Sequence, residues 1–316
     1  MSSARNLTKF LVLCLVWGLT WIAVKVGVNT VPPMLFAATR FIVAGIVLLG
    51  WSAATGVVAL PQGRRDLARL LAVSLLMITL CYGPLFWGMK FVASGTAAVL
   101  EMSLTPLALL AFGITMGEER WSSVRFGAMA LGVIGLAVLF APEITASDTS
   151  SATLFGLLAV AWAAISSAWG SVLARPLISD YGSKFLSGST TFIGGSALLA
   201  LSLMMEPDAL SSMTTVWSWQ VIVGWLFLVI FGSLIGYSIY MQLLRDIGPA
   251  RAGSFAFVSP AIAVGVGTSL AGETITPVGV TGMILMLMAA GGSLFAEQLT
   301  TLFSPARKVK PEIARR

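Results

Sequence analysis

Four ionisable residues lie inside otherwise apolar stretches of the chain: Lys25, Arg40, Lys90 and Glu101. A charged side chain within a bilayer costs roughly 2.5–3.5 kcal/mol on insertion scales, so each needs a partner or a function. We interpret the excess positive charge as a receiver for the carboxylate of a bound molecule, with Glu101 balancing that charge or carrying a proton. Two structural explanations stay open: the lysines could extend to the membrane interface, and Arg40 could pair with Glu101.

Aromatic side chains form a second candidate set. Trp17, Trp21 and Lys25 recur at i, i+4 and i+8, so they share one helix face. Interfaces are where tryptophan usually gathers, but Trp17 and Trp162 fall near the middle of apolar runs. An aromatic wall would suit an apolar or zwitterionic substrate and its ammonium group, and ordinary helix packing is the alternative. The set is Trp17, Trp21, Tyr82, Trp87, Trp162, Trp169, Tyr237 and Tyr240.

Three prolines are expected to interrupt or end helices: Pro84, Pro106 and Pro260. Such breaks provide bending points, so the prolines are candidate gating joints, with static kinks as the alternative. Glu118 and Glu273 recur at matching helix ends and are interpreted as caps or turn ligands, with a role in transport as the alternative.

Several classes of function lack the residues that they need. The chain has no histidine, and Cys14 and Cys81 lie in apolar runs without a Cys-x-x-Cys motif, so we expect no metal and no cofactor. No nucleophile with a base and no acid–histidine cluster supports an enzyme. The net charge of +6 is spread over short loops and a C-terminal tail, which argues against nucleic acid as a partner.

Composition places these residues in an all-α integral membrane protein. The chain is 57% hydrophobic and 10% charged, whereas soluble domains are near a quarter charged. The first apolar stretch carries Lys25 and lacks an Ala-x-Ala site, so we expect a retained membrane helix and no signal peptide. Runs of about 20 apolar residues predict ten transmembrane helices, at approximately 7–28, 33–55, 69–92, 94–116, 123–141, 152–174, 185–206, 219–245, 249–271 and 275–297.

Basic residues predict the orientation of the chain. Three of the 19 lysines and arginines lie within predicted helices, and the other 16 fall on one side if the N-terminus is inside. Because cytoplasmic loops carry an excess of Lys and Arg, we expect both termini to be cytoplasmic, in a bacterial inner membrane.

The two halves of the chain resemble each other. TAAVLEMSLTP (96–106) corresponds to ARAGSFAFVSP (250–260), Gly117-Glu118 to Gly272-Glu273, and Trp17 to Trp162. These matches predict two five-helix repeats, residues 1–148 and residues 149–316, the second with a basic cytoplasmic tail. An odd number of helices inverts the second repeat, an architecture common in secondary transporters, whose site lies near the midplane.

Four motifs resemble the drug/metabolite transporter superfamily, specifically the EamA-type exporters: VWGLTWIAVKVGV (16–28), PPMLFAATRFIVAG (32–45), SLTPLALLAFGITMGEE (103–119) and VSPAIAVGVGTSLAGE (258–273). The resemblance implies ten helices in two inverted halves and export of small metabolites, often amino acids or their derivatives. These motifs identify the scaffold well but discriminate poorly between substrates.

The sequence therefore predicts a secondary exporter that works by alternating access on a small-molecule substrate within the lipid bilayer. No nucleotide-binding motif occurs, so a gradient must drive transport, and protons are a candidate coupling ion. A lipid or lipid-precursor flippase and a drug efflux carrier are the alternatives on the same scaffold, followed by an integral membrane enzyme and a channel. The oligomeric state is not determined by the sequence.

Overall fold

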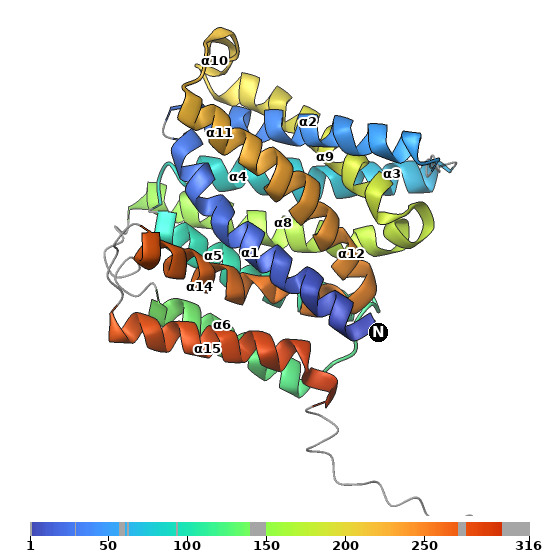
Figure 1. Ribbon diagram of the computed structural model, residues 1–316, viewed down its shortest axis with the longest axis vertical. Coiled ribbons are helices and arrows are strands. Elements are labelled where there is room, and N and C mark those ends of the chain that lie inside the picture. Colours follow the sequence, from blue (N-terminus) through green and yellow to red (C-terminus); the bar gives the residue numbers. More distant parts are fainter. Residues whose placement is uncertain are drawn as a thin grey trace, which may run out of the picture.

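The computed structural model describes residues 2–28, 30–56, 61, 63–92, 94–139, 150–270 and 276–298. Within these ranges the secondary structure is helical and no strand occurs, as the apolar runs predict. The long helices lie roughly along one direction and form a single bundle (Figure 1). Their bounds are α1 Ser2–Val28, α2 Pro33–Ala54, α3 Arg64–Ser74, α4 Leu80–Gly88, α5 Ser94–Thr115, α6 Ser123–Leu139, α8 Ser151–Tyr181, α9 Ser183–Met205, α10 Ala209–Thr214, α11 Trp219–Phe227, α12 Ser238–Ile247, α13 Pro249–Gly253, α14 Phe255–Leu270 and α15 Pro277–Leu294.

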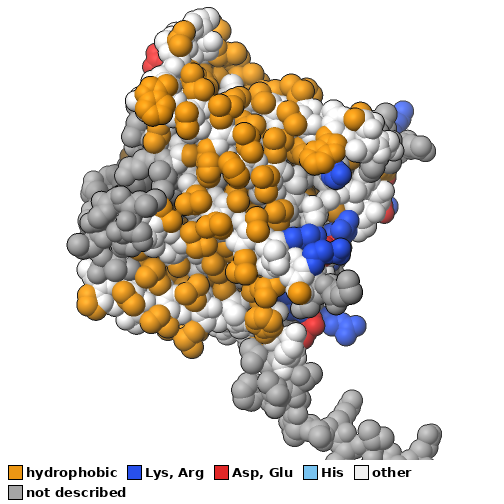
Figure 2. Space-filling view, viewed as in Figure 1, with side chains coloured by type: hydrophobic (Ala, Val, Ile, Leu, Met, Phe, Trp, Pro, Cys, Tyr) orange, Lys and Arg blue, Asp and Glu red, His pale blue; other side chains and the backbone are white. Residues whose placement is uncertain are grey.

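The surface of the bundle is suited to lipid. Among the described residues, eight helical segments are long and apolar enough to cross a membrane, and α6 is an apolar helix of shorter length. Large side chains such as Trp51, Leu154 and Met288 are exposed. Figure 2 shows apolar side chains spread over the visible face, with Lys and Arg gathered toward the end where α1 begins. The chain is therefore a multi-pass membrane protein.

The structure places a helix in each of the ten predicted apolar runs, although not every helix meets the length and composition of a membrane span. The number of crossings and the inverted repeat consequently stay predictions. The largest difference in bounds is in α8, which continues to Tyr181 where the apolar run was expected to end at residue 174. We call the end of the bundle where α1 begins the near end, and the opposite one the far end.

Two helix pairs lie at opposite edges of the bundle, α2 with α9 and α6 with α15 (Figure 1). Glycines permit their close approach. A β-carbon at Gly45 would lie 2.6 Å from the backbone nitrogen of Phe192, and one at Gly282 would lie 2.7 Å from the backbone nitrogen of Leu139. Small residues of this kind let helix backbones pack closely in membranes. These pairs flank the central helices, which carry the candidate site.

Two segments of π-helix interrupt long helices near their middle. The first, η1 (Leu75–Thr79), joins α3 to α4, and the second, η2 (Leu228–Tyr237), joins α11 to α12. Wide turns of this kind are rare and occur frequently at functional sites. They fall in the third and eighth apolar runs, which occupy corresponding positions in the two predicted repeats. Neither segment is anticipated by a pattern in the sequence.

The prolines differ from expectation, because each lies inside a continuous helix. Pro84 is within α4, Pro106 within α5 and Pro260 within α14. Membrane helices tolerate proline where neighbouring helices and local adjustments satisfy the freed backbone groups. None of the three ends a helix, and their role as gating joints stays a prediction.

Candidate functional site

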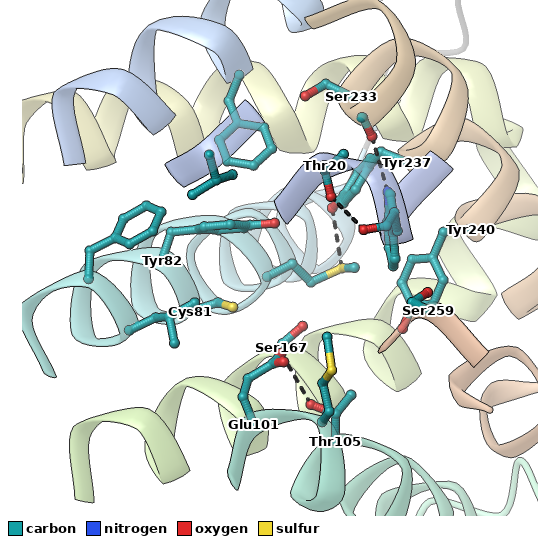
Figure 3. A pocket seen from close by; sticks show the side chains of 18 of the residues that line it. Thr20, Cys81, Tyr82, Glu101, Thr105, Ser167, Ser233, Tyr237, Tyr240 and Ser259 are labelled. Atoms are coloured by element: carbon teal, nitrogen blue, oxygen red, sulfur yellow. Dashed lines mark hydrogen bonds between the residues drawn. The ribbon is translucent and has the colours of Figure 1, made fainter. Parts of the chain in front are cut away.

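A cavity of about 160 Å³ lies among the central helices. Since about 10–15 Å³ holds one water molecule, the cavity has room for on the order of ten waters or for a small organic molecule. Figure 3 shows polar side chains from several helices directed into it. The lining includes Trp17 and Thr20 of α1, Arg40 of α2, Cys81 and Tyr82 of α4, Glu101 and Thr105 of α5, Ser233 and Tyr237 of η2, Tyr240 of α12 and Phe255 of α14.

Arg40 is the buried cation of this cavity. Only 6% of the residue is exposed, and its guanidinium carbon lies 4.5 Å from the ring centre of Phe41 and 5.3 Å from that of Tyr82. No described carboxylate forms an ion pair with it, and its Nε has no hydrogen-bond acceptor among the described residues. Contacts with aromatic faces offset part of the cost of burying this charge, and the buried Nε–H donor is left without a described partner.

Glu101 lies on a different wall from Arg40. Its carboxylate accepts a hydrogen bond of 3.4 Å from the Thr105 hydroxyl and forms no ion pair with any described residue. The Arg40 Nη1 instead lies 3.9 Å from where a β-carbon on Gly232 would stand, a position that the Thr20 methyl group approaches to 3.2 Å. Figure 3 shows Glu101 and Thr105 on the side of the cavity opposite Thr20 and Ser233. The expected alternative of an Arg40–Glu101 ion pair is therefore not found.

An unpartnered hydroxyl accompanies Arg40. Ser233 is 1% exposed, lines the cavity, and its Oγ has no hydrogen-bond partner among the described residues. Buried polar groups normally have partners, because leaving one unsatisfied costs about 1–3 kcal/mol. Arg40 and Ser233 thus both line the cavity and both carry a buried hydrogen-bonding group without a described partner.

Aromatic rings close the near side of the cavity. The ring centres of Trp17 and Phe255 are 4.5 Å apart, those of Trp17 and Tyr240 are 5.2 Å apart, and those of Tyr240 and Phe255 are 5.8 Å apart. Buried side chains of the same core, including Phe10 and Leu13, continue toward the near end. In the other direction the cavity follows α1 and α4 toward the far end, where Val24 and Met89 line it.

Polar contacts tie the near ends of the helices together. The Arg175 guanidinium pairs with Glu118 and donates a 2.8 Å hydrogen bond from Nε to the Leu244 carbonyl. Lys9 and Asp246 form an ion pair of 3.2 Å between α1 and α12. These contacts and the packed core lie between the cavity and the near end. Glu118, expected to be a cap, contributes to this tie, and Glu273 lies outside the described residues.

Removing the Arg175 tie is expected to open the cavity toward the near end. Arg175→Gln loses the Glu118 pair and weakens the contact with Leu244, and each such interaction contributes about 1 kcal/mol. We therefore expect a rise of roughly threefold to tenfold in the rate at which an impermeant maleimide reaches Cys81 from the near end. Cys14 is replaced by alanine so that Cys81 is the remaining cysteine, and labelling is compared between vesicles that expose the near end and vesicles that expose the far end. The exposed Arg120 provides the control, Arg120→Gln, and equal rates in the two variants would contradict the assignment.

The remaining predicted site residues lie elsewhere. Trp162 and Trp169 are 43% and 40% exposed and do not line the cavity. Trp87 packs against the core and contacts Phe91. Lys90 is exposed and lines a separate polar hollow at the far end with Glu206 and Asp208. The side chains of Trp21 and Lys25 lie outside the described part of the structure.

Sequence reasoning missed the small polar residues of the cavity: Thr20, Thr105, Ser167, Ser233 and Ser259. Serine and threonine occur throughout membrane helices, so only the fold distinguishes these from the others. It also missed Glu206, which is 5% exposed and accepts hydrogen bonds of 3.0 Å from the backbone N–H groups of Met34 and Leu35. Glu206 thereby caps α2 from the end of α9. No His, Cys, Asp or Glu cluster among the described residues could hold a metal ion.

Comparisons with known proteins agree with this architecture. The uncharacterized inner membrane transporter YedA of Escherichia coli is 29% identical over 303 residues, which cover 96% of this chain and 92% of YedA. A probable amino-acid metabolite efflux pump of Salmonella typhimurium is 24% identical over 284 residues, covering 88% and 90% of the two chains. Protein PecM of Dickeya dadantii is 27% identical over 299 residues, covering 94% and 93%.

A solved crystal structure shares the fold, with a TM-score of 0.77 at 17% sequence identity over 94% of this chain and 99% of the other. The EamA-like transporter family matches residues 7–141 and again residues 154–295. Together these two ranges span most of the sequence, which confirms the resemblance seen in its motifs and points to a transporter rather than an enzyme. The chain belongs to the EamA-like transporter family.

Proposed function

We propose that this protein is a secondary exporter of small metabolites, with amino acids or their derivatives as substrates. It works by alternating access across the bacterial inner membrane, with both termini in the cytoplasm. The observation that carries this proposal is the buried Arg40 guanidinium, which faces the cavity without a described carboxylate partner. The transporter names of relatives such as YedA and the Salmonella efflux pump support the same class.

A substrate carboxylate is the group that suits Arg40. The planar guanidinium presents its N–H donors in a fork that matches a carboxylate, and both partners then form strong charge-assisted hydrogen bonds. The Ser233 hydroxyl, which also lines the cavity, offers a further donor. A neutral substrate would leave the buried charge uncompensated, so it would bind less well than an anionic or zwitterionic one.

Glu101 gives the opposite wall a negative charge or a proton. A substrate ammonium could interact with Glu101 there, and the rings of Trp17 and Tyr240 suit an ammonium or an apolar side chain. Alternatively Glu101 exchanges a proton for the substrate, a common role for carboxylates within membranes. Both roles use the same position, and a pH gradient distinguishes them.

The difference between the two ends of the bundle supports an export cycle. The near end, which the basic residues predict to be cytoplasmic, is tied by Arg175 and Lys9, while the cavity extends toward the far end. This conformation corresponds to the outward-directed half of an alternating-access cycle. The two predicted repeats, residues 1–148 and 149–316, would provide the inward-directed half by exchanging their conformations.

Counterflow in proteoliposomes tests the proposal. Vesicles preloaded with one unlabelled amino acid are diluted into the same labelled compound, for a panel of amino acids and N-acyl derivatives. We expect saturable exchange, strongest for aromatic or sulfur-containing amino acids, because Trp17, Tyr82 and Met77 line the site. Exchange of no member of the panel would overturn the substrate class and favour lipid-like or cationic drug substrates, the two alternatives on this scaffold.

Glu101→Gln separates the two roles of the carboxylate. If Glu101 carries the proton, a pH gradient accelerates wild-type exchange, and the variant loses this acceleration while it retains exchange without a gradient. We expect that result because glutamine preserves the contact with Thr105 but cannot release a proton. The measurement is the ratio of rates with and without the gradient. An equal ratio in the two proteins would leave Glu101 as a substrate-binding group only.

A further inference from the structure

Each π-helical segment receives a hydrogen bond from a helix of the other predicted repeat. The Trp17 indole Nε1 of α1 donates to the Gly232 carbonyl of η2 at 3.2 Å, and the Ser166 hydroxyl of α8 donates to the Leu76 carbonyl of η1 at 2.8 Å. Side chains that bond into a widened turn satisfy backbone groups that the regular helix would pair internally. The two bonds thus satisfy backbone carbonyls in η1 and η2, the π-helical segments at corresponding positions of the two predicted repeats.

The indole of Trp17 packs against a glycine of η2. A β-carbon at Gly236 would lie only 2.5 Å from the Trp17 Nε1, so a glycine at this position leaves room for the indole. On its other side the ring contacts Phe255 and Tyr240, which also line the cavity. Ser166, by contrast, is fully buried and does not line the cavity. Of these two bonds to π-helical carbonyls, the one to η2 therefore comes from a side chain that lines the cavity.

The same helix connects η2 to the near-end ties. The residues Ser233 and Tyr237 of η2 face the cavity, and α12 continues directly from η2 with Tyr240 (Figure 3). One to two turns further along α12, the Leu244 carbonyl accepts the bond from Arg175 and Asp246 pairs with Lys9. One continuous helix therefore connects the cavity-lining residues of η2 to both near-end contacts.

We propose that Trp17 is a positioning residue that couples occupancy of the cavity to closure of the near end through its bond to the Gly232 carbonyl. A substrate held by Arg40 contacts the indole; displacement of the Nε1–H from Gly232 lets η2 change its turn and release α12 from Arg175 and Lys9. This inference rests on the proposed function, since it takes the cavity as the substrate site. It extends that function by assigning the hinge and the residue that controls it.

Trp17→Phe tests the coupling, because phenylalanine keeps an aromatic ring but has no N–H donor. The matched control is Trp162→Phe, the same change at the predicted repeat-related position, where the side chain is exposed and outside the cavity. Both readouts use the full chain in lipid nanodiscs or vesicles without substrate. They are hydrogen–deuterium exchange of residues 228–237 and of 75–79, and labelling of Cys81 by an impermeant maleimide from the near end.

We expect Trp17→Phe to speed amide exchange in residues 228–237 and Cys81 labelling by roughly threefold to tenfold, the change that corresponds to one buried hydrogen bond. Exchange in 75–79 and both readouts in Trp162→Phe stay at wild-type values. Gly236→Ala displaces the Trp17 indole from its contact with η2, so the effect of this change is not additive with that of Trp17→Phe. Neither readout requires a transported compound, so a failed counterflow panel would leave this test intact.

Three results would overturn the coupling. Unchanged exchange in 228–237 would show that the bond does not hold η2. An equal rise in 75–79 would show general loosening. Faster exchange in 228–237 with unchanged labelling of Cys81 would show that η2 does not control the near end.

Discussion

Arg40→Leu is expected to abolish measurable exchange in proteoliposomes while leaving a folded protein in the membrane. Charge-assisted hydrogen bonds contribute about 1.5–3 kcal/mol each, so losing the two that a guanidinium can make to a carboxylate weakens binding by roughly 100-fold or more. We expect the fold to tolerate loss of the charge, because no described carboxylate pairs with Arg40. Leucine in its place also removes a buried charge that has no ionic partner among the described residues, so the thermal midpoint should not fall.

Two further variants make this result specific. Arg40→Lys keeps the charge but not the planar fork, so we expect partial exchange with a raised KM. Arg64→Leu removes an exposed arginine at the start of α3 and should exchange at the wild-type rate. Exchange is measured by counterflow, and correct folding by size-exclusion chromatography of the solubilised protein. Wild-type exchange by Arg40→Leu would refute Arg40 as the receiver of the substrate.

The cost of placing a charge in lipid explains why Arg40 and Glu101 lie in the cavity, and it can be inferred from the sequence. An ionisable side chain in an apolar run must face the interior of the bundle or a polar cavity, and the structure places both residues there. Whether they pair depends on how α2 and α5 are placed around the cavity, and no local pattern contains that information. The structure separates them onto different walls, so each is available to a ligand.

The sequence does not distinguish the places of the aromatic residues, because the same side chain suits a cavity, a core or a lipid surface. Trp17, Tyr82, Tyr237 and Tyr240 line the cavity, whereas Trp162 and Trp169 are exposed. Apolar periodicity cannot distinguish these cases in a membrane helix that is hydrophobic all round. The π-helical segments were also beyond sequence reasoning, since glycine and small polar residues occur in ordinary membrane helices as well.

The start of α2 depends on Glu206, a residue far away in the sequence. α2 begins at Pro33, directly after Pro32, and neither residue offers a side-chain acceptor, so the first N–H groups of this helix lack a local cap. The Glu206 carboxylate, which is 172 residues away from Met34 in sequence, accepts from Met34 and Leu35, and the Ser202 hydroxyl donates to it at 2.7 Å. A negative charge at this helix N-terminus is also favoured by the helix dipole.

Glu206→Ala is therefore expected to destabilise the protein by about 2–4 kcal/mol, the cost of leaving buried N–H donors unsatisfied and losing charge-assisted bonds. Water from the adjoining polar hollow replaces part of the lost hydrogen bonding, which keeps the effect below the sum of three separate bonds. The measurement is the midpoint of thermal unfolding in detergent. Asp208→Ala is the matched control, because Asp208 is exposed two residues away and only its backbone carbonyl accepts hydrogen bonds from described residues. If the two variants unfold at the same temperature, Glu206 does not join α2 to α9. If only Glu206→Ala is destabilised, the carboxylate at the end of α9 holds the start of α2, the helix that carries Arg40.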